Sequence, residues 1–372
     1  MSSPCNSVDR LVAGGGLRPA VAVRSLMLGA MQPSRWLVGL QLVLPGVVLE
    51  PLAWLQVLIL RTRLRALQVP DDPIVIVGHW RSGTTFLHQL LSVDPQTATA
   101  RNSFTVAPQV AVLLKPWLAP VLQRWMSRTR PIDAVPWSAL DPQEDEIGLA
   151  RLTPDTNMAG VAFPQHYPHH FRRCVLASTA DFQQQLLHFT RLTWLHDGAG
   201  KTRLLIKNSA HTARVALLLR MFPKARFVLL KREPIASIRS LVQVKQSLAH
   251  LVGLQAPLDE VAQVEETTAA HRALMHAFER SRSLIPPGQL VEVAYGDLIA
   301  DPLAATERIY RELNLSGWHL AQPAIAQRAA MAQSYQAQPV QLSLAAEARL
   351  QELMTPAGAL AATGQTPPDR PH

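Results

Sequence analysis

Residues 74–91 constrain the fold of this chain more than any other segment, because they read as a strand, a glycine-bounded turn and a helix in direct succession. Ile74 to Val77 is a β-branched run behind the turn signal Asp-Asp-Pro, which predicts a buried parallel strand ending at Gly78. Thr84 to Leu91 has the spacing of a helix. The turn between them is typical of a loop that binds a phosphate through backbone N–H groups and a helix N-terminus.

Further apolar runs predict more strands of the same sheet. They lie at Arg203 to Lys207, at Ala225 to Leu230 and at Leu290 to Tyr295, with segments of helical spacing between them. This alternation implies a parallel sheet with right-handed crossovers, and ligands then bind at the carboxyl ends of the strands. We therefore expect an α/β fold, a P-loop-like parallel sheet flanked by helices.

Other regions depart from this alternation. Between about Ser92 and Thr202, many prolines and several tryptophans predict helical insertions around a pocket rather than sheet. Residues 1–34 are expected to be poorly ordered apart from a short helix. The expected organisation is an N-terminal extension with apolar helices at 1–70, the main domain at 71–354 and a disordered tail at 355–372.

An apolar stretch from Trp36 to Leu60 is long enough to cross a bilayer as a single helix. Pro45, Glu50 and Pro51 argue against one continuous helix. Two interpretations of the stretch remain: two short helices packed on the domain, or a helical hairpin that enters the membrane interface. A helix that spans the membrane is the weakest alternative. In the second case, residues 36–65 would make peripheral membrane contact, with the arginines that follow the stretch at the lipid headgroups: Arg61, Arg63 and Arg65.

Composition and charge limit the cellular compartment and the kinds of binding partner that we expect. Hydrophobic residues make up 48% of the 372 residues and charged residues 17%, so the chain as a whole is not disordered. The net charge of +9 suits an anionic partner, which could be a phosphorylated cofactor, an acidic lipid surface or a polyanion. Cys5 and Cys174 form neither a disulfide framework nor a zinc motif. We expect a cytoplasmic protein, peripheral at the inner face of the membrane if the apolar stretch binds lipid, and no nucleic-acid partner.

The glycine turn resembles the Walker A loop of nucleoside triphosphatases but lacks its lysine. Thr84 stands where the lysine should follow Gly83, and the strand that ends in Lys207 has no Walker B aspartate. A triphosphatase needs that lysine on its β- and γ-phosphates and a carboxylate for magnesium. The loop therefore suits a phosphate that carries no metal-bound γ-phosphate.

Three motifs together resemble a known family, the bacterial branch of the sulfotransferases that use 3'-phosphoadenosine-5'-phosphosulfate (PAPS). The turn Arg81, Ser82, Gly83, Thr84 and Thr85 looks like the family's 5'-phosphosulfate loop. Arg232 at a strand end and Ser240 in the next helix look like its 3'-phosphate motif, in which a planar guanidinium and a hydroxyl donate to the phosphate. Tyr295, at the end of a late strand, is similar to a tyrosine that lies near the nucleotide.

The resemblance implies transfer of a sulfuryl group from PAPS to an acceptor hydroxyl, with release of adenosine 3',5'-bisphosphate and without a metal. It does not identify the acceptor, which could be lipid-linked, a glycan or a small molecule. The alternatives are a variant P-loop kinase or nucleoside triphosphatase, and a non-catalytic protein that binds membrane surfaces.

The resemblance also implies catalytic residues. Lys207 would bridge the leaving phosphate and the sulfuryl oxygens. His211, close behind it, is one candidate for the base that takes the acceptor proton, since histidine titrates near neutral pH. Glu144 or Glu146 is the other. The acidic cluster also has a purely structural interpretation, in which Asp141 caps a helix, Pro142 takes its first position and Glu144 closes a capping box.

Overall fold

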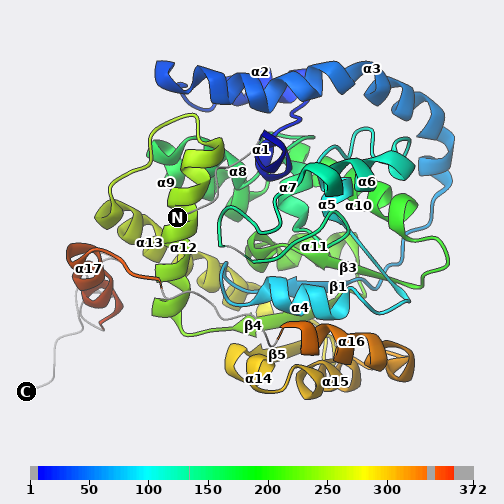
Figure 1. Cartoon of the computed structure of the whole chain (residues 1–372). Coiled ribbons are helices and arrows are strands. Elements are labelled where there is room, and N and C mark those ends of the chain that lie inside the picture. Colours follow the sequence, from blue (N-terminus) through cyan, green and yellow to red (C-terminus); the bar gives the residue numbers. More distant parts are fainter. Residues whose placement is uncertain (1–6, 134, 333–339, 356–372) are drawn as a thin grey trace, which may run out of the picture.

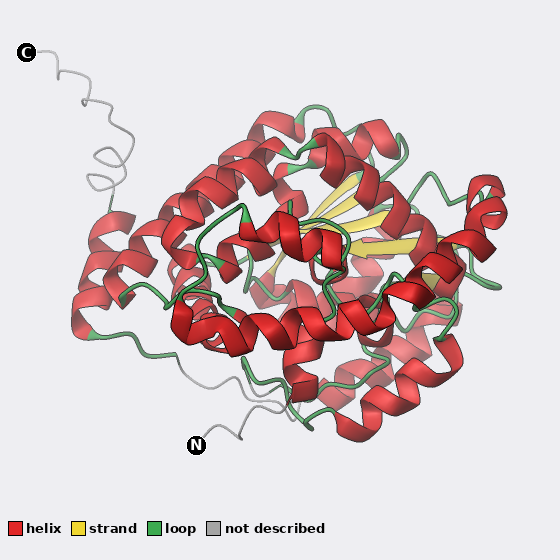
Figure 2. Cartoon of the chain, turned by 90° about the horizontal axis from the view of Figure 1, so that it is seen from above, coloured by secondary structure: helices red, strands yellow, loops and turns green. Residues whose placement is uncertain are grey.

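The computed structural model describes residues 7–133, 135–332 and 340–355. At its centre lies a five-stranded sheet with the strand order β2-β3-β1-β4-β5, and every neighbouring pair is parallel. Helices flank the sheet (Figures 1 and 2). The strands are β1 (Ile74–Val77), β2 (Thr97–Thr99), β3 (Arg203–Lys207), β4 (Arg226–Lys231) and β5 (Leu290–Ala294).

Alternate residues of the strands enter two separate apolar clusters, as expected for a parallel sheet covered on both faces. Val75 and Ile206 pack with helices of one face, and Ile76 and Leu205 with helices of the other. The first face is covered by α10 (Ala180–Asp197), α11 (Val215–Met221) and α13 (Glu260–Arg282). The second is covered by α4 (Thr84–Leu91), α14 (Tyr295–Ala300), α15 (Pro302–Glu312) and α16 (Trp318–Ala332).

β2 is a strand that the sequence did not predict, because we expected no sheet between Ser92 and Thr202. It has only three residues, too few for an alternating pattern to show. Its pairing with β3 places Thr97 opposite Arg203 and extends the sheet by one edge strand. The predicted helices of the insertion are present: α5 (Asn102–Thr105), α6 (Lys115–Trp125), α7 (Asp145–Leu149), α8 (Met158–Ala162) and α9 (Tyr167–His170).

The N-terminal region is more ordered than predicted. It forms α1 (Ser7–Gly14) and α2 (Pro19–Leu26). Both carboxylate oxygens of Asp9 bond to Ser127, and Arg151 donates to the carbonyls of Leu11 and Val12. These partners lie more than a hundred residues away in sequence, so the local pattern of the N-terminal segment did not reveal them.

The apolar stretch is one continuous helix, α3 (Trp36–Ala66), so the prediction of a break at Pro45 and Pro51 was wrong. The Leu42 carbonyl, in the turn before Pro45, accepts hydrogen bonds from Gly16 (2.8 Å) and Leu17 (3.1 Å). Contacts with this preceding segment stabilise a helix that proline would otherwise interrupt. Figure 1 shows α3 lying along the top of the molecule and bending down one side.

The remaining helices pack beside α13. They are α12 (Pro234–Val252), which carries Ser240, and α17 (Leu344–Met354). The expected boundary at residue 70 falls between the end of α3 and the start of β1. The predicted disordered tail lies outside the described residues, apart from Thr355.

Candidate functional site

The turn between β1 and α4 has the backbone that its glycines predict. Gly78 and Gly83 have φ angles of +137° and +96°, and Arg81 also has a positive φ of +67°. A Cβ at Gly83 would lie 2.6 Å from the ring of Tyr295, and one at Gly78 would lie 2.5 Å from the Leu230 carbonyl oxygen. Both positions therefore require glycine, for conformation and for space.

The loop meets the second predicted motif directly. Arg81 Nε donates to Ser240 Oγ at 3.0 Å, and Arg232 donates to the Arg81 carbonyl oxygen at 2.8 Å. The Arg232 guanidinium also lies 4.3 Å from the ring centroid of Tyr295. The structure thus brings together Arg81, the pair Arg232 and Ser240, and Tyr295, which come from three separate segments of the sequence.

The remaining loop residues form the start of α4. Gly83 occupies the N-cap position, and Thr84 and Thr85 are the first two residues of the helix. Ser82 is buried, and its hydroxyl donates to the His79 carbonyl within the loop at 2.7 Å. The N-terminus of α4 therefore opens beside the Arg81–Ser240 contact, which is the arrangement that favours a bound anion.

Lys207 ends β3 next to this loop and forms an ion pair with Glu144. Its Nζ lies 3.2 Å from Glu144 Oε1, which also accepts from the Ser209 backbone N–H at 2.8 Å. Burial lowers the pKa of Lys207. The negative charge of Glu144 opposes that shift, while the positive charges of Arg130 and Arg81 add to it. The structure thus places Lys207 and Glu144, two of the three predicted catalytic residues, in direct contact.

His211 lies deeper. It is fully buried, its Nδ1 is 3.2 Å from Arg214, and its Nε2 has no hydrogen-bond partner among the described residues. Burial and, to a smaller extent, the positive charge of Arg214 lower the pKa of His211 to about 3. His211 is therefore neutral at physiological pH but a weak base.

Glu146 belongs to a buried polar network with Arg214 and Asn208. Its carboxylate pairs with Arg214 at 3.0 Å and accepts from the Asn208 amide at 2.6 Å. The pKa of Glu146 is lowered because, against the opposing effect of burial, Arg214 and hydrogen bonds from Asn208 and Asn157 stabilise the carboxylate. Removing one partner of such a buried pair costs about 3–5 kcal/mol, so Glu146 supports folding of the insertion.

The capping interpretation of the acidic cluster was wrong. α7 begins at Asp145 with Glu144 in the N-cap position, and the Glu144 side chain makes no capping bond. Pro142 instead forms an antiparallel bridge with Arg101, and the Gln143 N–H donates to the Ala100 carbonyl at 2.9 Å. Because of this pairing, α7 begins only at Asp145, and the Glu144 side chain contacts Lys207.

Sequence reasoning missed Arg130 and Asp133. Asp133 lies 2.8 Å from an Arg81 nitrogen and 2.7 Å from an Arg130 nitrogen, so the loop arginine and an insertion arginine share one carboxylate. Neither residue belongs to a motif that the sequence displays. Only the three-dimensional placement of the insertion beside the loop reveals them.

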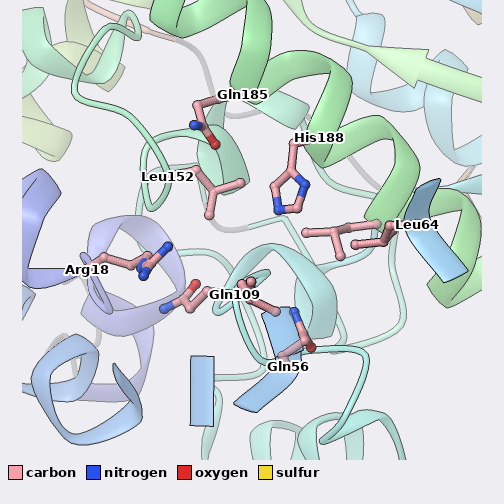
Figure 3. A pocket seen from close by; sticks show the side chains of 9 residues that line it. Arg18, Gln56, Leu64, Gln109, Leu152, Gln185 and His188 are labelled. Atoms are coloured by element: carbon pink, nitrogen blue, oxygen red, sulfur yellow. The ribbon is translucent and has the colours of Figure 1, made fainter. Parts of the chain in front are cut away.

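Two of the hollows among the described residues bear on the site. The first, of about 390 Å³, adjoins Arg232 and Tyr295 at the ends of β4 and β5. The second, of about 260 Å³, lies between α3 and α10 (Figure 3). Its lining combines aliphatic and polar side chains: Arg18, Gln56, Val57, Leu64, Gln109, Leu152, Gln185, His188 and Leu192. Within the described part of the chain, no group of three or more histidine, cysteine, aspartate or glutamate residues could hold a metal ion.

The central strand of the parallel sheet leads through a glycine turn into a helix N-terminus, and arginines and a lysine lie at the carboxyl edge of the sheet. This arrangement is typical of an α/β protein that binds a phosphorylated nucleotide. A family model described as "Sulfotransferase family" matches residues 73–319, which is more than half of the chain. The chain therefore belongs to the sulfotransferase family, whose general sulfuryl donor is PAPS.

Individual relatives agree with this assignment. The chain is 28% identical over 325 residues to proteins of Mycobacterium bovis and Mycobacterium tuberculosis named omega-hydroxy-beta-dihydromenaquinone-9 sulfotransferase Stf3, covering 87% of this chain and 83% of each relative. The fold is similar to the crystal structures of two sulfotransferases. STF1 of M. tuberculosis gives a TM-score of 0.62 at 18% identity over 87% of both chains. STF9 of Mycobacterium avium gives 0.64 at 16% identity over 98% of this chain and 93% of its own.

The predicted fold class and the predicted enzyme class are both confirmed by these comparisons. A variant kinase or triphosphatase and a non-catalytic scaffold are excluded, since the family catalyses sulfuryl transfer.

Proposed function

We propose that this chain transfers a sulfuryl group from PAPS to a hydroxyl of a lipid-linked acceptor, and that the loop, Lys207 and the Arg232–Ser240 motif hold the donor. The observation that supports the donor site most strongly is the chain of contacts from Ser240 through Arg81 to Arg232. It joins the two phosphate motifs into one cationic surface beside the N-terminus of α4. A nucleotide with phosphates at both its 3' and 5' positions can engage both motifs at once.

In the proposed reaction the acceptor oxygen attacks the sulfur, the bond from sulfur to the 5'-phosphate oxygen breaks, and the acceptor proton passes to a base. Lys207 stabilises the negative charge that develops on the leaving phosphate oxygen. Arg81 and the loop N–H groups bind the 5'-phosphate. No metal is required, because these cations supply the positive charge.

We propose Glu144 as the base. Its carboxylate contacts Lys207, so it lies next to the group that the donor would engage. His211 is the weaker candidate, because it is fully buried and its pKa is lowered to about 3, chiefly by burial. The low basicity of a neutral imidazole of this kind makes it a poor proton acceptor.

The Lys207→Ala variant tests the mechanism. It should lose sulfation activity by at least about a hundredfold, since it removes a charge that stabilises the leaving group, while adenosine 3',5'-bisphosphate still binds through Arg232 and the loop. Single-turnover transfer from sulfur-labelled PAPS measures the first effect and calorimetry the second. Lys224→Ala, which removes a lysine whose side chain is 68% exposed, is the matched control. Unchanged transfer in Lys207→Ala would disprove this role.

The proposed acceptor class follows from the N-terminal helices. The relative named above acts, by its name, on a hydroxylated menaquinone, which is a lipid. Only a narrow stripe of α3 is buried: Leu42, Gly46, Ala53, Gln56 and Leu60. The opposite side exposes large apolar residues, among them Val48 (67%), Trp54 (64%) and Leu58 (72%). An exposed apolar surface of this extent is typical of a membrane-binding protein.

We propose that α3 lies in the membrane interface rather than across the bilayer. Of the described residues, Pro33–Ala66 is the one helical segment that is long and apolar enough to span. α3 is packed along the protein body, and its last turns expose Arg61, Arg63 and Arg65, which suit anionic headgroups. Contact through residues 36–65 would place a cytoplasmic enzyme at the inner face of the membrane.

The hollow beneath α3 fits an amphiphile that enters from that side. Val57 lines the hollow and is also exposed on the apolar surface of α3. Gln109 is buried in the lining, and its side-chain oxygen has no hydrogen-bond partner among the described residues. Figure 3 shows Gln109, Gln185 and His188 around the same space. These groups can bond a polar part of the amphiphile, while the aliphatic side chains contact its hydrocarbon chain.

A further inference from the structure

Two arginines share the carboxylate of Asp133 beside the phosphate loop. One is Arg81 of the phosphate loop, at 2.8 Å. The other is Arg130, which makes two bonds to the carboxylate, at 2.7 and 3.0 Å. The Asp133 side chain is 7% exposed and those of Arg81 and Arg130 are 28% and 18% exposed, so solvent screens the group only weakly.

Arg130 lies close to the proposed donor site, although both of its side-chain hydrogen bonds are made to Asp133 in its own segment. It shares Asp133 with Arg81, and Arg81 in turn contacts Ser240 at 3.0 Å. The positive charge of Arg130 also contributes to the lowered pKa of Lys207, which places it near the end of β3. The insertion therefore adds a guanidinium to the cations that come from β1 and β3.

The charges in this cluster do not balance internally. Arg81 and Arg130 carry two positive charges against the single negative charge of Asp133. A guanidinium binds a carboxylate and a phosphate or sulfate with the same planar pattern of N–H donors. An anion that approaches the Arg81 guanidinium competes with the Asp133 carboxylate for its positive charge.

We propose that Arg130 is a further donor-binding residue and that Asp133 is its internal competitor. The Asp133 carboxylate holds Arg81 and Arg130 in position, and the 5'-phosphosulfate of the donor takes over bonds to both. Arg130 strengthens donor binding, whereas Asp133 weakens it. This inference rests on the proposed donor site and adds to it a residue of the insertion.

The two residues of the ion pair should have opposite effects on affinity. We expect Arg130→Ala to weaken binding of adenosine 3',5'-bisphosphate about tenfold, in line with the loss of one charge-assisted hydrogen bond. Asp133→Asn should tighten binding severalfold, because the amide fills the same space without competing as an anion. Arg130→Lys should recover part of the affinity, since it restores the charge but not the planar geometry.

The measurement is titration calorimetry with adenosine 3',5'-bisphosphate at one fixed ionic strength, with urea unfolding of each variant as the control for folding. Arg128→Ala removes an exposed charge from the same segment, and Glu307→Gln removes an exposed carboxylate from α15. Neither control should change affinity by more than about twofold, because exposed charges interact weakly with distant sites.

Two results would overturn the inference and leave the proposed function standing. One is tight binding by wild-type protein with no loss in Arg130→Ala. The other is weaker binding in both single variants, Asp133→Asn and Arg130→Ala. That result would mean that the ion pair only stabilises the segment. Failure of the wild-type protein to bind adenosine 3',5'-bisphosphate would instead overturn the donor site itself.

Discussion

At the scale of single residues, the site is defined by which charges contact each other. Lys207 pairs with Glu144, and Glu146 pairs with Arg214, although the two glutamates are only two positions apart. The start of α7 between them directs their side chains to different partners. One carboxylate therefore lies in the proposed active site, and the other supports folding of the insertion.

We predict that Glu144→Gln slows single-turnover sulfation far more than His211→Gln. The expected loss for Glu144→Gln is about a hundredfold or more, which is typical for removal of a general base. Urea unfolding of both variants separates catalytic from folding effects, which matters because His211 is buried. Full activity in Glu144→Gln with a large loss in His211→Gln would reverse the assignment.

The pH dependence of the wild-type enzyme gives an independent check on these two residues. His211, with a pKa of about 3, stays neutral from pH 5 upward, so its protonation should cause no loss of kcat/KM near the usual histidine range. In the proposed mechanism Lys207 must be protonated to stabilise the leaving phosphate. Since burial lowers its pKa, activity should fall at alkaline pH before the usual lysine range of about 10.4 is reached.

Much of the donor site could be predicted at this scale, because its residues lie in local motifs. Arg81, Arg232 and Tyr295 each follow a strand end, Ser240 lies in the helix that begins just after Arg232, and the structure brings the four into contact. Arg130 and Asp133 could not be predicted. Their positions depend on how the insertion packs on the sheet, and no local spacing encodes that.

At the scale of elements, the strand, turn and helix at residues 74–91 were predicted with almost the observed boundaries. The pattern of a buried strand followed by glycines is strong because backbone conformation and close packing both require those residues. β2 and the continuity of α3 were missed. A three-residue edge strand and a proline-containing helix are both stabilised by tertiary contacts that override local preference.

We predict that Gly83→Ala largely abolishes binding of adenosine 3',5'-bisphosphate. The residue has a φ of +96°, and a Cβ there would meet the Tyr295 ring at 2.6 Å, so either the loop or the tyrosine must move. Gly296→Ala is the matched control, because no atom lies within 4 Å of a Cβ at that position and its φ is not positive. Calorimetry measures the affinity, and equal affinity in both variants would contradict the proposed role of the loop.

At the scale of the whole molecule, the proposed function assigns different partners to the apolar surface of α3 and to the charged edge of the sheet. Figure 1 shows α3 at one end of the molecule and α14 to α16 at the other. We propose that α3 faces the membrane and its lipid acceptor, while the nucleotide binds at the carboxyl ends of the strands. The sequence predicted an apolar N-terminal segment. Which side of α3 is exposed could not be predicted, because it depends on which of its residues pack against the rest of the protein.

We predict that the protein floats with vesicles of phosphatidylglycerol and binds phosphatidylcholine vesicles more weakly, because Arg61, Arg63 and Arg65 favour anionic headgroups. Replacing three exposed residues of α3 by serine (Val48, Leu58 and Ile59) should abolish flotation. The control replaces three exposed residues of α16 and α17 (Leu320, Met331 and Leu344) in the same way and should leave it unchanged. Equal flotation of both triple variants would contradict the assignment of this surface.

The proposed donor site requires that two distant phosphate motifs hold one nucleotide without a metal. Calorimetric titration of the wild-type protein with adenosine 3',5'-bisphosphate in the presence of a metal chelator tests it most directly. We predict one binding site per chain and a loss of affinity of about tenfold or more in Arg232→Ala, which removes a charged donor to a phosphate. Absence of binding, or binding that requires magnesium, would contradict the account.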